Sequence, residues 1–272
     1  TLYDIRKSKG TFQPFDVGPL LGAVADSFEL YYQIASIPYF HMARVRDTAG
    51  QALGQIKTQI IKAAGITPHP SIHDVLGDLN ALEADPTPLD DTKAARASLH
   101  NAMAALDYYG TDTTRPIAFR AVANWAARGA TLPDESGAAE DAVFAMIRGQ
   151  AAAYLSRGAT ETPIITCSDG LAQHDRIMTL LADEAAAARS RCDEGLYLAI
   201  KDFAADMQPT LLRRAYGQPA MVTYQLPGAV SSLAAAHEIY GDGRRYRDIE
   251  KWNPQTMPFL VGPSVVAIRS TT

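Results

Sequence analysis

The stretch from Met221 to Arg269 constrains the fold most, because two runs of strand-forming residues enclose two short helical segments. Pro227 and Gly228 end the first run, and Gly241-Asp242-Gly243 separates the two helical segments. The expected elements are a strand at 222–226, helices at 229–240 and 244–252, and a strand at 265–268. Residues 219–272 are therefore predicted to form a small α+β domain of βααβ order. We expect its core to contain Leu233, Ile239, Tyr240, Ile249, Trp252 and Ile268.

Before this stretch the chain shows helical periodicity interrupted by glycine and proline. Residues 17–165 are predicted to form an alanine-rich helical domain, and the fold class is therefore mainly α with the small α+β domain at the end. Residues 1–16 have mixed charge and no period, which indicates an extended arm. The expected helices of the helical domain are Gly18–Ala35, Phe40–Ala64, one starting at Ser71, Asp90–Tyr109, Arg115–Arg128 and Ala138–Arg157.

Residues 166–218 are predicted to form one long connecting helix, with Gly195 as the place for a bend. Its apolar stripe runs from Ile177 through Leu196 to Met207, and alanine dominates it. Small residues allow helices to approach closely, so packing within one chain is favoured and an intersubunit bundle is the alternative. Alanine-rich helices bury a modest area per residue, which is a reason to expect an assembly.

Several residues of the C-terminal stretch resemble the LysM-like fold, and more closely the C-terminal end of the DNA circularisation proteins of Mu-like bacteriophages. The matching residues are Tyr240-Gly241-Asp242, the arginines Arg244, Arg245 and Arg247, Asn253, Met257-Pro258-Phe259 and Gly262. The resemblance covers roughly Cys167 to Arg269. Members of that family carry a β-rich domain before the helical region. The chain begins at Thr1, so we expect it to be part of a longer polypeptide.

The resemblance implies a structural component of a contractile phage tail, at the baseplate hub or the end of the tail tube. The implied partners are other tail and baseplate proteins (hub, tube and tape measure) and further copies of the chain in a symmetric oligomer. The implied location is the virion, after synthesis in the cytoplasm of the bacterial host.

Composition and motifs point away from an enzyme. The chain has 272 residues, 47% of them hydrophobic, a net charge of −5 and two cysteines. We therefore expect no thiolate metal site, no membrane span and, given the acidic balance, no direct contact with DNA. His69 and His73 are separated by Pro70, and the adjacent His174 and Asp175 should point apart on a helix. We expect no catalytic, metal or cofactor site.

Six basic residues are the main polar feature and our candidate partner-binding set. Asp242, Asp248 and Glu250 are interleaved with them, so their net excess of charge is small. A solvated helix face with internal ion pairs is the first interpretation, docking on an acidic protein surface is the second, and contact with nucleic acid is the third. The six residues are Arg213, Arg214, Arg244, Arg245, Arg247 and Lys251.

Two other classes of function remain open: a peptidoglycan-binding LysM module, and a protein that binds or circularises DNA ends. LysM modules that bind sugar typically carry Gly-Asp-Thr-Leu after their first strand. Here that loop reads Leu226 to Val230, without the polar residues, which argues against sugar binding. A pull-down on peptidoglycan separates the first class, and the salt dependence of DNA binding separates the second.

Overall fold

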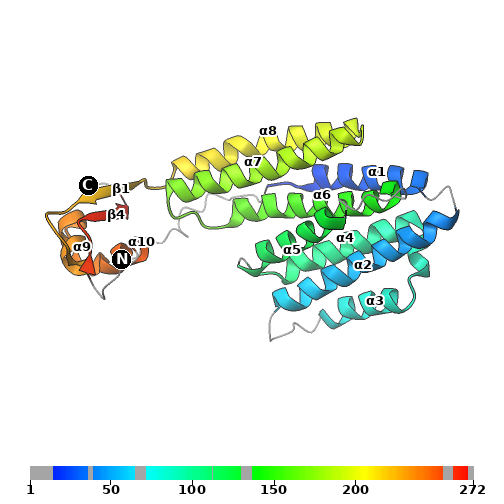
Figure 1. Ribbon diagram of the computed structural model, residues 1–272, viewed down its shortest axis with the longest axis horizontal. Coiled ribbons are helices and arrows are strands. Elements are labelled where there is room, and N and C mark those ends of the chain that lie inside the picture. The colour runs from blue at the N-terminus through cyan, green and yellow to red at the C-terminus, as the bar shows by residue number, and fades with distance from the viewer. Residues whose placement is uncertain are drawn as a thin grey trace. The chain divides into compact units, whose positions relative to one another are not determined.

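The computed structural model describes residues 15–35, 39–64, 72–111, 113–129, 137–253 and 260–268. The predicted fold class is confirmed at the coarse level, because these residues are mainly helical with a few short strands at the C-terminal end (Figure 1). No helix among them is long and apolar enough to span a membrane. Residues 1–14 of the expected arm lie outside the described ranges.

Among the described residues, the helical part begins with six α-helices and one 3-10 helix. They are α1 (Gly18–Ala35), α2 (Tyr39–Ala64), α3 (Ile72–Ala84), η2 (Thr87–Asp90), α4 (Thr92–Tyr109), α5 (Thr114–Gly129) and α6 (Gly137–Glu161). The later elements are α7 (Cys167–Ser190), α8 (Glu194–Tyr216), β1 (Met221–Gln225), β2 (Val230–Ser231), α9 (Ser232–Tyr240), η3 (Gly243–Arg245), α10 (Tyr246–Trp252), β3 (Leu260–Val261) and β4 (Ser264–Ile268).

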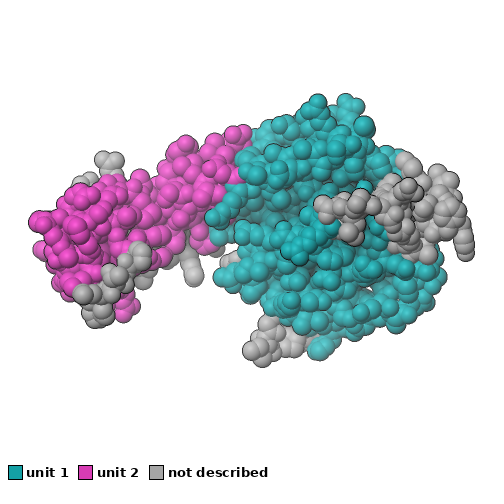
Figure 2. Space-filling model, in the orientation of Figure 1, with its two compact units in different colours: residues 1–162, 176–207 teal, residues 163–175, 208–272 magenta. Residues whose placement is uncertain are grey.

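The chain divides into two compact units (Figure 2). Residues 1–162 and 176–207 form the first, which we call the helical unit. Residues 163–175 and 208–272 form the second, so α7 and α8 each contribute to both units. Within the second unit we call residues 221–268 the C-terminal module.

Helix α6 is the centre of the helical unit and is packed against α1, α2, α4 and α5. Nearly every side chain from Ala142 to Ser156 is buried, so the helix has no solvent face along this length. A Cβ added at Gly149 would lie 2.7 Å from a methyl carbon of Val24, which shows how closely α1 and α6 approach. The alanine-rich helices therefore enclose a buried core within one chain.

The prediction of one long helix over 166–218 is wrong, because a turn at Arg191–Asp193 separates α7 from α8. Cys192 adopts a left-handed φ of 59°. Its N–H donates to the Arg189 carbonyl, and the Asp193 N–H donates to the Ala188 carbonyl, both at 3.0 Å. This pattern is the Schellman helix end. The Asp193 carboxylate then accepts from the Leu196 N–H at 3.0 Å, which caps α8.

The C-terminal module has the predicted order of strand, helix, helix, strand. Strand β1 pairs antiparallel with β4, from Met221 opposite Ile268 to Gln225 opposite Ser264. A second, two-residue ladder joins β2 to β3, which the sequence did not indicate. Ser231 caps α9 by accepting from the Ala234 N–H at 3.2 Å.

The core of the module only partly matches the predicted set. Ile249 is fully buried, and Ile239 and Tyr240 pack against the buried cluster, as expected. The prediction for Leu233 is wrong, because its side chain is 59% exposed. Trp252 and Ile268 are half-buried and lie outside the cluster. The buried cluster consists of Leu226, Ala235, Ala236, Ile249, Val261, Val265 and Ala267.

The error at Leu233 is one of helix phase. The inward face of α9 runs through Ser232, Ala235, Ala236 and Ile239, and successive helical residues are about 100° apart. Leu233 therefore projects to one side of that face. A methyl group at Gly243 would lie 3.5 Å from the Leu233 side chain, so the leucine covers the turn that follows α9.

Two polar side chains join the helices of the module to β4. The Asn253 amide donates to the carbonyls of Ile249 and Val266 at 2.7 and 2.8 Å, and its oxygen accepts from the Val266 N–H at 2.8 Å. The Tyr240 hydroxyl accepts from the Ile268 N–H at 3.1 Å. These bonds give partners to the backbone groups of Val266 and Ile268, which would otherwise be unpaired on the open edge of β4.

Candidate partner-binding surface

Four of the six candidate basic residues lie together on η3 and α10. Gly241 ends α9 with a left-handed φ of 69°, and its N–H donates to the His237 carbonyl. The Asp242 carboxylate then accepts from the Arg244 N–H at 2.9 Å and starts η3. This Gly-Asp turn fixes where the basic segment begins.

Arg245 is held inside the module. Its guanidinium lies 3.8 Å from the centre of the Tyr240 ring, which is within cation–π range. Its Nε donates to the Asp248 carboxylate at 3.0 Å. Burial raises the pKa of the Tyr240 hydroxyl above its ordinary value. Arg245 therefore belongs to the scaffold, as the interpretation of internal ion pairs predicts.

Arg244, Arg247 and Lys251 are exposed, and we call them the basic face. Their spacing of three and four residues places them on one side of a helical segment. The Arg247 Nε donates to the Tyr246 hydroxyl at 3.3 Å, and this bond raises the pKa of the guanidinium. The Lys251 Nζ lies 4.8 Å from the centre of the Trp252 ring. Within the described residues, none of the three forms an ion pair with a carboxylate.

The interleaved acidic residues are engaged elsewhere. The Asp242 carboxylate caps a backbone N–H, and Asp248 pairs with Arg245. Glu250 accepts from the hydroxyl of the buried Ser232 at 2.8 Å. Within the described residues, none of these carboxylates forms an ion pair with the basic face, although, besides the hydrogen bond from Arg247 to Tyr246, the charge of Glu250 also raises the pKa of the Arg247 guanidinium.

Arg213 and Arg214 lie on the last turn of α8, on a different element from the other four. Arg213 is exposed, whereas Arg214 is half-buried, and this burial lowers the pKa of its guanidinium.

Residues 208–272 contain seven basic and four acidic residues, a net charge of +3. Residues 1–207 contain 18 basic and 26 acidic residues, a net charge of −8. The excess of positive charge is confined to the C-terminal part.

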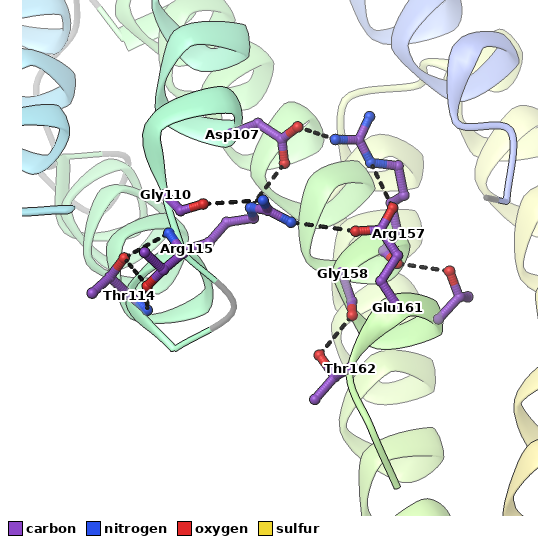
Figure 3. Close-up of polar contacts among 10 residues, drawn as sticks. Asp107, Gly110, Thr114, Arg115, Arg157, Gly158, Glu161 and Thr162 are labelled. Carbon is purple, nitrogen blue, oxygen red and sulfur yellow. Dashed lines mark hydrogen bonds and ion pairs between the residues drawn. The ribbon is translucent and has the colours of Figure 1, made fainter. Parts of the chain in front are cut away.

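The helical unit has a polar cluster that the sequence analysis missed (Figure 3). Asp107 at the end of α4 pairs with Arg157 of α6 and lies 3.5 Å from the Nε of Arg115 on α5. Glu161 lies 3.3 Å from Arg115 and 3.7 Å from Arg157. Two arginines and two carboxylates neutralise one another, and Arg115 also donates to the Gly110 carbonyl at 3.0 Å. This cluster ties three helices together. Only the Arg157–Glu161 spacing of four was visible in the sequence.

A second buried pair joins α6 to α7. The Arg148 Nε donates to Glu184 at 3.2 Å, and both side chains are largely buried. Burial raises the pKa of Glu184 above its ordinary value, although the nearby arginine acts in the opposite direction.

The histidines give no metal site in the part of the chain that the structure describes. No group of three or more histidine, cysteine, aspartate or glutamate side chains is placed there to hold an ion. His73 is exposed, and His69 lies outside the described residues. His174 and Asp175, which we expected to point apart, are hydrogen-bonded at 2.9 Å. The side chains are long enough to meet around the helix, so that expectation is wrong.

Comparison of the sequence with models of known protein families gave no match, and comparison with curated protein sequences gave none either.

Proposed function

We propose that the chain is a structural component of a contractile phage tail, at the baseplate hub or the tube end, and acts through protein–protein contacts. The placement in a tail rests on the resemblance of residues 167–269. The main support for action through protein–protein contacts is the basic face. Arg244, Arg247 and Lys251 are exposed, and within the described residues they have no carboxylate partner. Such a face is suited to an acidic protein surface, where complementary charge favours association.

We also propose that the C-terminal module is a variant of the LysM-like fold that has no sugar site. In support, β1 and β4 pair around two short helices. The segment after β1 offers few polar groups to a ligand. Leu226 is buried, its N–H donates to the Pro263 carbonyl, and Pro227, Gly228 and Ala229 follow. A fold can persist after its ancestral site has been lost.

The proposal is tested by reversing charge on the basic face. A tagged chain carrying R244E and R247E is expressed in bacteria that produce the tails, and the tails are purified and probed for the tag. We expect the variant to be absent from tails while its circular dichroism and thermal unfolding match the parent. The matched control, K62E and K93E, changes the net charge equally at two exposed lysines and should be incorporated. Incorporation of both variants at the parental level would refute the proposal.

Binding to DNA ends is a second candidate, which the net charge of +3 on residues 208–272 favours. The cationic groups of Arg247 and Lys251 lie beside Tyr246 and Trp252, an arrangement that could also serve stacked bases. Binding of a blunt-ended duplex is measured at several salt concentrations. A steep loss of affinity with salt that disappears in the R244E/R247E variant would support this second function. The tail proposal predicts no measurable binding at physiological salt.

A further inference from the structure

A groove on the helical unit carries acidic residues and is a candidate binding surface for the basic face. It encloses about 450 Å³ between α1 and the start of α8. Its apolar lining includes Ala23, Leu30 and Leu196, and Leu30 is 55% exposed. Leu198, on the next exposed turn of α8, is 50% exposed. Two half-exposed leucines beside an apolar groove indicate a surface suited to contact with another molecule.

Carboxylates border this groove. Asp26 of α1 and Glu194 of α8 are exposed and line it. Two further exposed carboxylates, Asp202 and Asp206, follow Leu198 along α8 at intervals of four residues. Lys201, also exposed, is the one basic residue between them and Leu198. Within the described residues, neither Asp26 nor Glu194 forms an ion pair. Asp193 differs, because it accepts from the Ser27 hydroxyl and caps α8. The free carboxylates at the groove are therefore Asp26 and Glu194.

The two surfaces are complementary in charge and belong to regions of opposite net charge. Residues 1–207 carry −8 and residues 208–272 carry +3. We infer that the acidic groove of one copy receives the basic face of a second copy of the chain. The inference rests on the proposed function, since it names the partner of the same basic face. Arg244 and Arg247 of the second copy would lie against Asp26 and Glu194.

This contact joins two different surfaces, so it is heterologous. A heterologous contact repeats head to tail and generates a closed ring when the rotation between neighbours closes. Such a ring would match the rotational symmetry expected of the tail in the proposed function.

Charge exchange tests the contact in the full chain. One variant carries D26R and E194R, and the other carries R244E and R247E. Sedimentation velocity over a range of concentrations gives the association constant of each. We expect the parent to self-associate. The association constant of each variant alone should be at least about tenfold lower, because like charges then face each other. An equimolar mixture should regain association, since each groove again meets a face of opposite charge.

Matched controls and the remaining outcomes decide the inference. D74R/D78R and K62E/K93E reproduce the two changes in net charge at exposed sites away from the groove, and they should associate like the parent. A parent that stays monomeric at every concentration, or a mixture that regains nothing, would overturn the inference. If R244E/R247E alone is excluded from tails while D26R/E194R is incorporated, the proposed function stands and the partner is a different protein.

Discussion

The helical unit and the C-terminal module use their charged residues in opposite ways. In the helical unit, Asp107, Arg115, Arg157 and Glu161 satisfy one another between three helices. In the module, Asp242 caps a backbone N–H, Asp248 pairs with Arg245 and Glu250 accepts from Ser232, while three cations face outward. Charge fastens α4, α5 and α6 to one another, whereas the three cations on η3 and α10 remain available to a partner.

The largest effect is expected at Asp107, which is almost fully buried. Asp107→Ala removes the carboxylate that faces both Arg115 and Arg157 and leaves Glu161 alone to balance the two arginines, so we expect a loss of about 3 kcal/mol in the free energy of unfolding. Asp78→Ala, at an exposed position of α3, is the control and should stay within about 0.5 kcal/mol of the parent. Each unit contains one tryptophan, so Trp125 fluorescence in a Trp252→Phe background reports the helical unit alone. Equal losses in the two variants would show that the cluster does not fasten the helices.

In the module, packing should matter more than charge. Ile249→Ala removes a fully buried side chain and should cost about 2–4 kcal/mol. Leu233→Ala, at the position wrongly predicted to be core, should cost less than about 1 kcal/mol because the side chain is mostly exposed. Urea unfolding followed by Trp252 fluorescence in a Trp125→Phe background measures both. A larger loss for Leu233→Ala would contradict the core as described.

The link between α10 and β4 gives a smaller effect. Asn253→Ala removes three hydrogen bonds and leaves the Val266 N–H and carbonyl without that partner, so we expect a loss of about 2 kcal/mol. Asn101→Ala, on the exposed side of α4, is the control. Amide hydrogen exchange should show Val266 losing protection in the first variant only. Unchanged protection there would mean that the amide does not support β4.

Helix α1 spans Gly18–Ala35 as predicted, because the helical periodicity of its apolar residues is a local signal. The end of α7 was missed because a cysteine, Cys192, takes the left-handed position that glycine usually marks. The cap at Asp193 was the local signal that could have revealed the start of α8.

The candidate site was predictable in part. The sequence located the basic segment and its acidic neighbours, but which acid pairs with which base depends on the turn at Gly241 and on the phase of α10. The Asp107–Arg157 pair joins residues fifty positions apart, and nothing local marks it. The groove likewise forms from α1 and α8, which are distant in sequence. Contacts of this kind follow from packing and not from periodicity.

The smallest effect concerns pH. Because burial raises the pKa of Glu184, the folded chain retains this proton where the unfolded chain has lost it. The stability that the neutral carboxyl contributes is present at low pH and is lost as pH rises through the folded pKa. Glu184→Gln should therefore lose less stability than the parent as pH rises above the ordinary range of a glutamate. Asp78→Asn, at an exposed position of α3, should follow the parent. Parallel curves for the parent and Glu184→Gln would show that this carboxyl titrates alike in the folded and the unfolded chain.

The most direct test of the comparison is the unfolding free energy of the R244E/R247E variant, measured by Trp252 fluorescence in the Trp125→Phe background. Both arginines lie at or before the first turn of α10, where the helix dipole disfavours cations by about 0.3–1 kcal/mol. If the basic face serves a partner, reversal should leave the stability unchanged or raise it slightly. A loss approaching that expected for Asp107→Ala would show that these arginines hold the module together, and it would contradict the account.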